Sequence, residues 1–175
     1  MDHLPIFINI RKKPCVVIGG GDIALRKINL LLKAQAKVIC LSPLFCKGIK
    51  NLSKDGHITL INKSFDQTDI KDYSIIIAAT DDSSVNSSIS AIAQVKKIPV
   101  NVVDSPELSS FIMPSIVDRS PLIIAVSSSG KAPVLSRIIR AKLETVIPSA
   151  YGILADIAGE YRQKVKDRFS TIKDR

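Results

Sequence analysis

The sequence predicts an α/β fold built on a parallel sheet, and three observations support this prediction. An apolar run at 15–18 passes directly into three glycines and then into a helical pattern at 24–34. A second apolar run at 37–41 follows that pattern, as expected of a right-handed strand–helix–strand crossover. A third run, at 74–79, is apolar from its second residue on, which is typical of a central parallel strand covered on both faces.

The three glycines at 19–21 match a turn that binds the phosphates of a dinucleotide. Gly19 permits the tight strand-to-helix turn, Gly21 lets the backbone approach a pyrophosphate, and Ala24 fills the third small position, where helix and strand pack closely. Peptide N–H groups and the helix dipole favour an anion there. The sequence therefore predicts a Rossmann-like sheet with a glycine-rich dinucleotide turn, while a purely structural glycine turn is the alternative.

The residues after the second strand bear on the choice between NAD and NADP. An acidic residue usually binds the ribose hydroxyls at this point. Here the strand ends in Leu41, Ser42 and Pro43 instead, so the motif alone leaves the choice open. We expect Ser42 and the backbone at Pro43 and Leu44 to lie beside the ribose.

The strand at 74–79 ends in a polar segment that is also expected at the cofactor. Ligands of open α/β sheets bind outside the carboxyl ends of the strands, so Thr80 and Asp81 should flank the adenine and its ribose. Capping of the next helix by Asp82 or Ser83 is the alternative, and capping and cofactor contact can coexist. The predicted cofactor-binding residues are Gly19, Gly21, Asp22, Ile23, Pro43, Leu44, Thr80 and Asp81.

The composition is that of an ordinary globular protein. Of the 175 residues, 46% are hydrophobic and 23% charged, which allows one sizeable core and a small appendage. We expect a cytoplasmic protein without a membrane partner, because the chain has neither an apolar run near 18 residues nor a secretory leader pattern. Cys15, Cys40 and Cys46 form no C-x-x-C pair, and two of them lie in predicted strands, which favours reduced, buried thiols.

The formal charge of +9 suggests an acidic partner, and nucleic acid is the simplest candidate. Two observations argue against nucleic acid: aromatic residues make up only 5% of the chain, and no nucleic-acid-binding motif is visible. From residue 131 onward, the chain has ten Lys and Arg residues but only five Asp and Glu residues. A solvated helix face or a ligand with several carboxylates explains this excess better.

Shorter patterns predict the remaining elements of the first half. An apolar strand at 4–10 should lie at an edge of the sheet. A short helix is predicted at 45–53, a strand at 57–61, a helix at 85–97 and a strand at 100–103. The only histidines are His3 and His57, so the sequence cannot form a histidine metal cluster, and no protein metal site is predicted.

Asp104 directly follows the strand at 100–103, which puts it at the same edge of the sheet as the glycine turn. A carboxylate at that edge can act as a base. The alternative is a turn-forming aspartate before Ser105 and Pro106. From the residues alone, both interpretations stay open.

The second half of the chain reads as a separate, smaller structure. Apolar strands are predicted at 110–113 and 122–126 around a polar turn at 118–121, which would begin a second sheet or an interface. The loop 127–133 places three hydroxyls and a glycine before a helix that Pro133 can begin. It can hold an anion or serve as an ordinary N-cap. Two helices with apolar stripes complete the prediction, the first ended by Pro148.

Taken together, six blocks of this sequence resemble the dehydrogenase and ferrochelatase module of the sirohaem synthase family. The resemblance covers essentially the whole chain, and the blocks are long and in the correct order. They are 1–7, 17–27, 78–82, 101–104, 110–115 and 126–135.

The resemblance implies a homodimeric enzyme with an NAD-binding domain at 1–112, a small α+β dimerisation region at 113–147 and a helical tail at 148–175. NAD+ would take a hydride from precorrin-2 to give sirohydrochlorin, and ferrous iron would then enter as a substrate to give sirohaem. The family's general base for both steps matches Asp104. The serine that matches Ser128 can be phosphorylated and lies beside the tetrapyrrole pocket.

The resemblance also suggests how the substrate is held. Tetrapyrrole carboxylates need cations and N–H donors, which Lys131, Arg137 and the serine loop with Ser128 can supply, and Asn101 is a further predicted substrate-binding residue. Related proteins carry a uroporphyrinogen methyltransferase after this module, so we expect either a stand-alone version with a separate methyltransferase or a fragment. A non-catalytic NAD-sensing module, which would need neither Asp104 nor the serine loop, is the alternative function.

Overall fold

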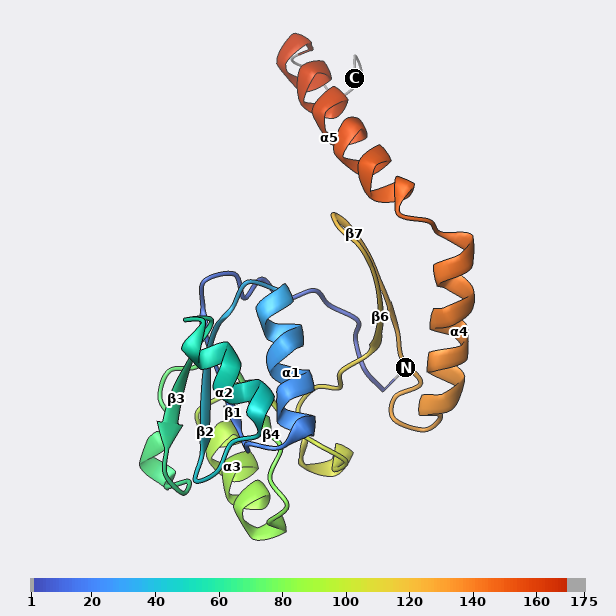
Figure 1. The fold of residues 1–175 in the computed structure, drawn as a ribbon. Coiled ribbons are helices and arrows are strands. Elements are labelled where there is room, and N and C mark those ends of the chain that lie inside the picture. The colour runs from blue at the N-terminus through green and yellow to red at the C-terminus, as the bar shows by residue number, and fades with distance from the viewer. Residues whose placement is uncertain (1, 170–175) are drawn as a thin grey trace. The chain divides into compact units, whose positions relative to one another are not determined.

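The computed structural model describes residues 2–169, and Figure 1 shows their fold. The chain divides into two compact units, Met1–Ile112 and Met113–Arg175. Each unit is described by itself. No helix among residues 2–169 combines the length and the apolar character that crossing a bilayer requires.

The first unit contains a five-stranded sheet in the order β3-β2-β1-β4-β5, in which every pair is parallel. Its central strands are apolar and buried because helices cover both faces. The order reverses between β1 and β4, and open α/β sheets bind their ligands outside the carboxyl ends of the strands at such a reversal. The strands are β1 (Pro14–Ile18), β2 (Lys37–Ser42), β3 (Ile58–Asn62), β4 (Ile75–Ala78) and β5 (Val100–Val102).

Three helices connect these strands: α1 (Asp22–Lys33), α2 (Lys47–Lys54) and α3 (Ser83–Val95). In α1 the buried face is apolar and is formed by Ala24, Ile28 and Leu31. The connections also contain two short 3₁₀ turns, η1 (Gln67–Asp69) and η2 (Pro106–Leu108). The sheet and helices of the predicted Rossmann-like domain are thus present, with boundaries that move by at most two residues.

The N-terminal segment differs from the prediction, because residues 4–10 form no strand. Leu4, Ile6 and Phe7 are between 65% and 74% exposed. A tight turn, in which the Lys13 N–H donates to the Ile10 carbonyl, leads from this segment into β1. Since β1 already pairs with β2 on one side and β4 on the other, it offers no free side for a hairpin partner.

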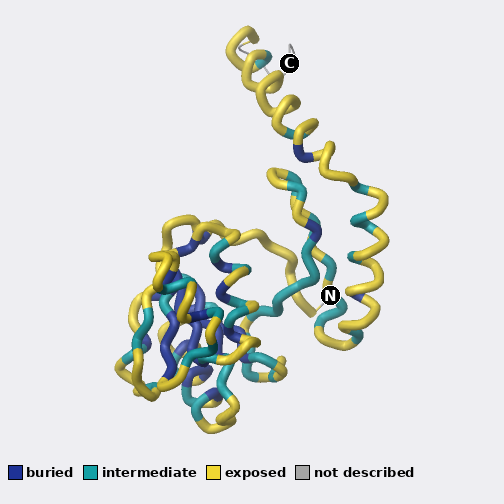
Figure 2. Tube along the Cα trace, in the orientation of Figure 1, coloured by how far each residue is buried: buried dark blue, intermediate teal, exposed yellow. Residues whose placement is uncertain are grey.

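The second unit begins with an antiparallel hairpin of β6 (Ser115–Arg119) and β7 (Leu122–Val126), followed by α4 (Pro133–Val146) and α5 (Ala150–Arg168). Its elements are joined by specific contacts. The Arg119 guanidinium donates from Nε to the Ile147 carbonyl at 2.8 Å and from Nη2 to the Glu144 carbonyl at 3.2 Å, which satisfies the C-terminal end of α4. Figure 2 shows that most of α4 and α5 is exposed within this unit.

The first strand predicted for this region, at 110–113, is wrong. The segment before β6 instead closes the free edge of β5 with its side chains. The Val100 N–H donates to Ser110 Oγ at 2.8 Å, and the Val102 N–H donates to Ser109 Oγ at 2.9 Å. Serine hydroxyls thus accept the hydrogen bonds that the carbonyls of a neighbouring strand would accept. The segment therefore does not pair with β5 as a strand, and the hairpin starts only at Ser115.

Candidate functional site

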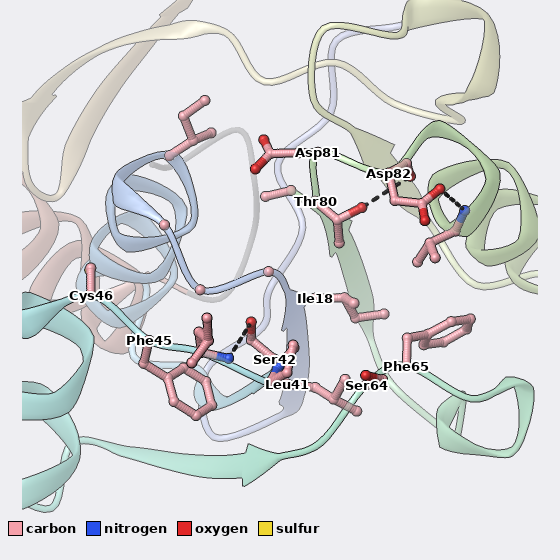
Figure 3. A pocket seen from close by; sticks show the side chains of 18 of the residues that line it. Ile18, Leu41, Ser42, Phe45, Cys46, Ser64, Phe65, Thr80, Asp81 and Asp82 are labelled. Carbon is pink, nitrogen blue, oxygen red and sulfur yellow. Dashed lines mark hydrogen bonds between the residues drawn. The ribbon is translucent and has the colours of Figure 1, made fainter.

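A pocket of about 930 Å³ opens at the carboxyl edge of the sheet (Figure 3). Its walls come from the ends of β1, β2 and β4, from the start of α1 and from the loop after β3. All eight predicted cofactor-binding residues line it: Gly19, Gly21, Asp22, Ile23, Pro43, Leu44, Thr80 and Asp81. The fold therefore brings together residues that lie up to 62 positions apart in the sequence.

Each of the three positions in the turn is glycine for a different physical reason. A Cβ on Gly19, which has φ +127°, would lie 2.1 Å from the Ala79 carbonyl oxygen, and one on Gly20 would lie 1.8 Å from the Leu44 carbonyl oxygen. Both glycines are thus required by the loops that pack against the turn. A Cβ on Gly21 would meet no atom within 4 Å. The bare backbone of Gly21 consequently borders open space in the pocket, where a ligand can approach it closely.

Hydrogen bonds from β2 and the loop after it hold the turn in place. The Gly19 N–H donates to the Leu41 carbonyl at 2.9 Å, and the Cys46 N–H donates to the Gly20 carbonyl at 2.8 Å. The Cys40 thiol donates to the Gly19 carbonyl, with Sγ and O 3.3 Å apart. Burial raises the pKa of Cys40 to about 12, with a smaller contribution from Cys46, so the thiol keeps the proton that it donates.

The N-terminus of α1 points its unpaired backbone donors into this pocket. Gly21 is the N-cap residue, and no side chain caps the helix. The first N–H groups of a helix have no partner inside it, and the helix dipole makes them attractive to an anion. The bare backbone at Gly21 and these uncapped N–H groups fit the pyrophosphate of a dinucleotide.

The segment after β4 both caps a helix and lines the pocket, as the sequence allowed. Asp82 accepts hydrogen bonds from the Ser84 N–H at 2.8 Å and the Val85 N–H at 3.2 Å, and so caps α3. Hydrogen bonds from the Ser84 side chain and from these two N–H groups lower the pKa of Asp82. Figure 3 shows Asp82 turned towards α3 and the Asp81 carboxylate turned away from it.

Several pocket residues were not predicted from the sequence, most clearly Phe45 and Phe65, whose rings appear in Figure 3. Both are partly buried. Phe65 and its neighbour Ser64 follow the end of β3, so the rule that ligands lie at the carboxyl ends of strands would have found them. Phe45 precedes α2, and no motif marks it. The two rings give this part of the pocket apolar surfaces.

Asp104 does not line this pocket but lies at the same edge of the sheet, two residues after the end of β5. It is exposed and has φ +57°, a conformation that aspartate tolerates better than most residues. The turn that holds it is cross-linked. The Ser105 N–H donates to the Val102 carbonyl at 3.2 Å, and the Ser109 hydroxyl donates to the Ser105 carbonyl at 3.0 Å. Asp104 thus occupies a rigid turn, and its carboxylate makes none of these bonds.

Asn101 has a structural contact of its own. It is buried in β5, and its Nδ2 donates to the Phe111 carbonyl at 3.1 Å. This bond helps to attach the segment before β6 to the sheet. The amide oxygen and the second N–H of Asn101 therefore remain as groups for a substrate.

The other predicted substrate-binding residues belong to the second unit. Lys131 and Arg137 are exposed, and Ser128 is half-buried. The ordinary N-cap alternative for the serine loop is wrong in detail, because the N-cap of α4 is Ala132, which makes no side-chain cap. Ser128 instead accepts a hydrogen bond from the Ala132 N–H at 2.9 Å.

Comparison with known proteins identifies the family through three matched segments. Residues 6–115 match a family described as "Putative NAD(P)-binding", residues 119–145 match the sirohaem biosynthesis protein central region, and residues 150–175 match the sirohaem synthase dimerisation region. The chain belongs to the sirohaem synthase family.

Members of the sirohaem synthase family are similar to this chain along its whole length. It is 57% identical over 175 residues to the siroheme synthase of Ruthia magnifica subsp. Calyptogena magnifica, covering 100% of this chain and 37% of the relative. It is 51% identical over 170 residues to that of Nitrosomonas europaea, covering 97% and 36%. The chain thus spans little more than a third of the length of these curated relatives.

A solved structure shows the same fold. The chain has a TM-score of 0.82 and 22% identity to "SirC, precorrin-2 dehydrogenase", with 98% of this chain and 84% of that chain covered.

In the sirohaem synthase family, the region described as the dimerisation region falls on residues 150–175. That range contains α5, where Ile153, Leu154 and Tyr161 are between 59% and 64% exposed.

Proposed function

We propose that this chain is the NAD-dependent precorrin-2 dehydrogenase module of a sirohaem synthase and acts in the cytoplasm. The observation that carries the proposal is the pocket at the reversal of strand order, with open space at Gly21 and an uncapped α1 beside it. Rossmann-like domains bind dinucleotides at this point. The similarity to siroheme synthases supports the choice of substrate.

In this proposal, bound NAD+ supplies the acceptor for a hydride from the substrate. The backbone of Gly21 and the first turn of α1 hold the pyrophosphate. Ser42, Pro43 and Leu44 lie beside the ribose of the adenosine, and Thr80 and Asp81 flank it from the end of β4. The hydride leaves precorrin-2 with its electron pair, so a base must take the second hydrogen as a proton.

We propose Asp104 as that base. Its turn is held by Ser105 and Ser109, which keeps the carboxylate at the carboxyl edge without occupying its oxygens in those bonds. A base on a rigid element needs little reorganisation when it accepts a proton. The loss of one hydride and one proton balances the two-electron oxidation of precorrin-2 to sirohydrochlorin.

The second unit is proposed to hold the carboxylates of the tetrapyrrole in a homodimer. Lys131 and Arg137 supply exposed cations, and the loop at Ser128 supplies hydroxyl and N–H groups. Asn101, in β5, would contribute its second amide N–H, since the other already donates to the Phe111 carbonyl. Phosphorylation of Ser128 would place negative charge beside these cations and so oppose substrate binding. A uroporphyrinogen methyltransferase, fused or separate, would supply the substrate.

Insertion of ferrous iron into sirohydrochlorin is proposed as a second reaction of the same site. Among residues 2–169, no group of three or more His, Cys, Asp and Glu side chains is arranged to hold a metal ion. The pyrrole nitrogens of the substrate would therefore be the ligands. Metal insertion releases two N–H protons, which Asp104 can accept in turn.

The test is to mix the chain with precorrin-2 and NAD+ and to follow NADH formation by absorbance. We expect NADH and sirohydrochlorin in equal amounts, followed by the spectrum of sirohaem once ferrous iron is added. Tight NAD binding without NADH formation would contradict the dehydrogenase and favour a regulatory module that senses NAD. Oxidation without iron insertion would remove only the second reaction.

We also expect the pocket to prefer NAD over NADP. Three aspartates line it, Asp22, Asp81 and Asp82, and none of its lining residues is Lys or Arg. A 2′-phosphate would therefore lack a cationic partner, and NAD should bind at least about tenfold more tightly. Calorimetric titration with both dinucleotides measures this, and Pro43→Arg, which adds a cation beside the ribose, should narrow the ratio. Equal affinities in the unaltered chain would contradict the expected preference.

A further inference from the structure

Asn86 has an unusual position for an asparagine. It lies one turn into α3 and is only 8% exposed, although asparagine is mostly found at the surface and favours helix ends over helix interiors. The start of α3 is already capped by Asp82, which accepts from two N–H groups. Capping therefore gives no reason for a buried amide at this position.

Both ends of the Asn86 amide are bonded to one residue, Thr80. The Nδ2 of Asn86 donates to the Thr80 carbonyl at 2.9 Å, and its Oδ1 accepts from the Thr80 hydroxyl at 2.8 Å. The first bond fixes the orientation of the amide, because a carbonyl can only accept. A single buried side chain thus holds both the backbone and the side chain of Thr80, and burial strengthens these bonds against competition from water.

Thr80 lines the cofactor pocket, whereas Asn86 does not. Thr80 also lies against the glycine turn, since a Cβ on Gly19 would be 3.3 Å from the Thr80 nitrogen. It is therefore close to the place proposed for the pyrophosphate, and the riboses are the groups that adjoin the pyrophosphate in a dinucleotide. Asn86 can act on the cofactor only through Thr80.

The hydrogen bonds also decide what the Thr80 hydroxyl offers to a ligand. Its partners are Asn86 Oδ1 and the Asp82 carbonyl, the latter at 3.2 Å, and both are acceptors. Figure 3 shows the bond towards Asp82. The single proton of the hydroxyl is committed to these partners, so its oxygen retains only lone pairs. A cofactor group that bonds to this oxygen must be a donor, as a ribose hydroxyl is.

We propose that Asn86 is a positioning residue for the cofactor: its amide holds Thr80 in one orientation, with the hydroxyl oxygen placed to accept a hydrogen bond from a ribose hydroxyl of NAD. The inference rests on the proposed function, in which the pocket binds NAD. It goes beyond that function because it gives a residue outside the pocket control over the affinity. Without the amide, Thr80 has several orientations, and binding must select one of them at a cost in affinity.

The test measures NAD affinity by calorimetric titration for Asn86→Leu, Thr80→Val and the double variant. We expect each single variant to bind NAD about fivefold more weakly, as for the loss of one hydrogen bond. The double variant should match Thr80→Val, because Asn86 affects NAD only through the hydroxyl that valine removes. Normal NAD affinity in Asn86→Leu, or losses that multiply in the double variant, would overturn the inference.

The matched control is Ser90→Ala, which removes another buried hydrogen bond of α3. Ser90 Oγ donates to the Leu108 carbonyl at 2.6 Å, and Ser90 does not line the pocket. This variant should unfold at lower denaturant concentration but bind NAD as the unaltered chain does. An equal loss of NAD affinity in Ser90→Ala would show that any loosening of α3 has this effect, and would also reject the positioning role.

A second measurement separates this inference from the proposed function. The ¹³C resonance of the Thr80 methyl group reports the orientation of its side chain, and it should shift in Asn86→Leu but not in Ser90→Ala, whether or not NAD binds. If Asn86→Leu does not fold, Asn86→Ala takes its place, since it leaves room for water at the Thr80 carbonyl. An unchanged methyl signal rejects the role of Asn86, while an unaltered chain that binds no NAD rejects the proposed cofactor site.

Discussion

Replacing Asp104 by asparagine is expected to lower kcat for precorrin-2 oxidation by about 100-fold or more, because the amide cannot accept the proton that leaves with the hydride. Asparagine is the sharpest substitution at this position. It tolerates φ +57° at least as well as aspartate, so the turn closed by Ser105 and Ser109 should persist. Asp104 lies outside the cofactor pocket, so the affinity for NAD should stay unchanged.

Single-turnover kinetics and NAD titration together check this expectation for Asp104→Asn. Glu107→Gln is the matched control, since Glu107 is an exposed carboxylate three residues away in η2 and has no proposed role. It should oxidise precorrin-2 at the normal rate. Turnover retained in Asp104→Asn would remove this residue from the mechanism, and lost NAD affinity would show that the substitution disturbs the pocket.

Gly20→Ala is expected to lower mainly the stability of the fold, and Gly21→Ala mainly the affinity for NAD, although the two positions are adjacent. A Cβ on Gly20 would meet the Leu44 carbonyl oxygen at 1.8 Å, and only a shift of backbone relieves that overlap. Gly20→Ala should therefore lower the free energy of unfolding by about 3 kcal/mol. Gly21 has no atom within 4 Å of its Cβ position, so Gly21→Ala should cost no more than about 1 kcal/mol, as expected at an N-cap.

The affinity for NAD should fall in Gly21→Ala even though the protein stays folded. In Gly21→Ala, the added methyl group occupies space that the pyrophosphate needs, so a folded protein should lose at least about tenfold in NAD affinity. Denaturant titration and calorimetric titration measure the two quantities separately. Gly159→Ala, in the open surface of α5, controls for the exchange of glycine for alanine and should leave NAD affinity unchanged. Normal NAD binding by Gly21→Ala would argue against the proposed pyrophosphate site.

Local patterns predicted much of the first unit. Apolar runs with flanking turns located β1, β2 and β4, and the 3.6-residue period located α1, because both signals come from residues close together in the chain. The same patterns were wrong at 4–10, next to β1, which has no free edge, and at 110–113, where serine hydroxyls rather than backbone carbonyls accept from the N–H groups of the edge strand β5. Periodicity carries no information about either condition.

The candidate site, too, could be predicted from the sequence only in part. The sequence by itself determined the glycine turn, the polar ends of the strands and the place of Asp104 after β5, since each depends on residue type and order along a strand. That Gly20 must be glycine and that Phe65 lines the pocket were decided only by the tertiary structure. The physical reason is that each depends on an atom more than 20 residues away in the sequence, which only the packing of the parallel sheet brings near.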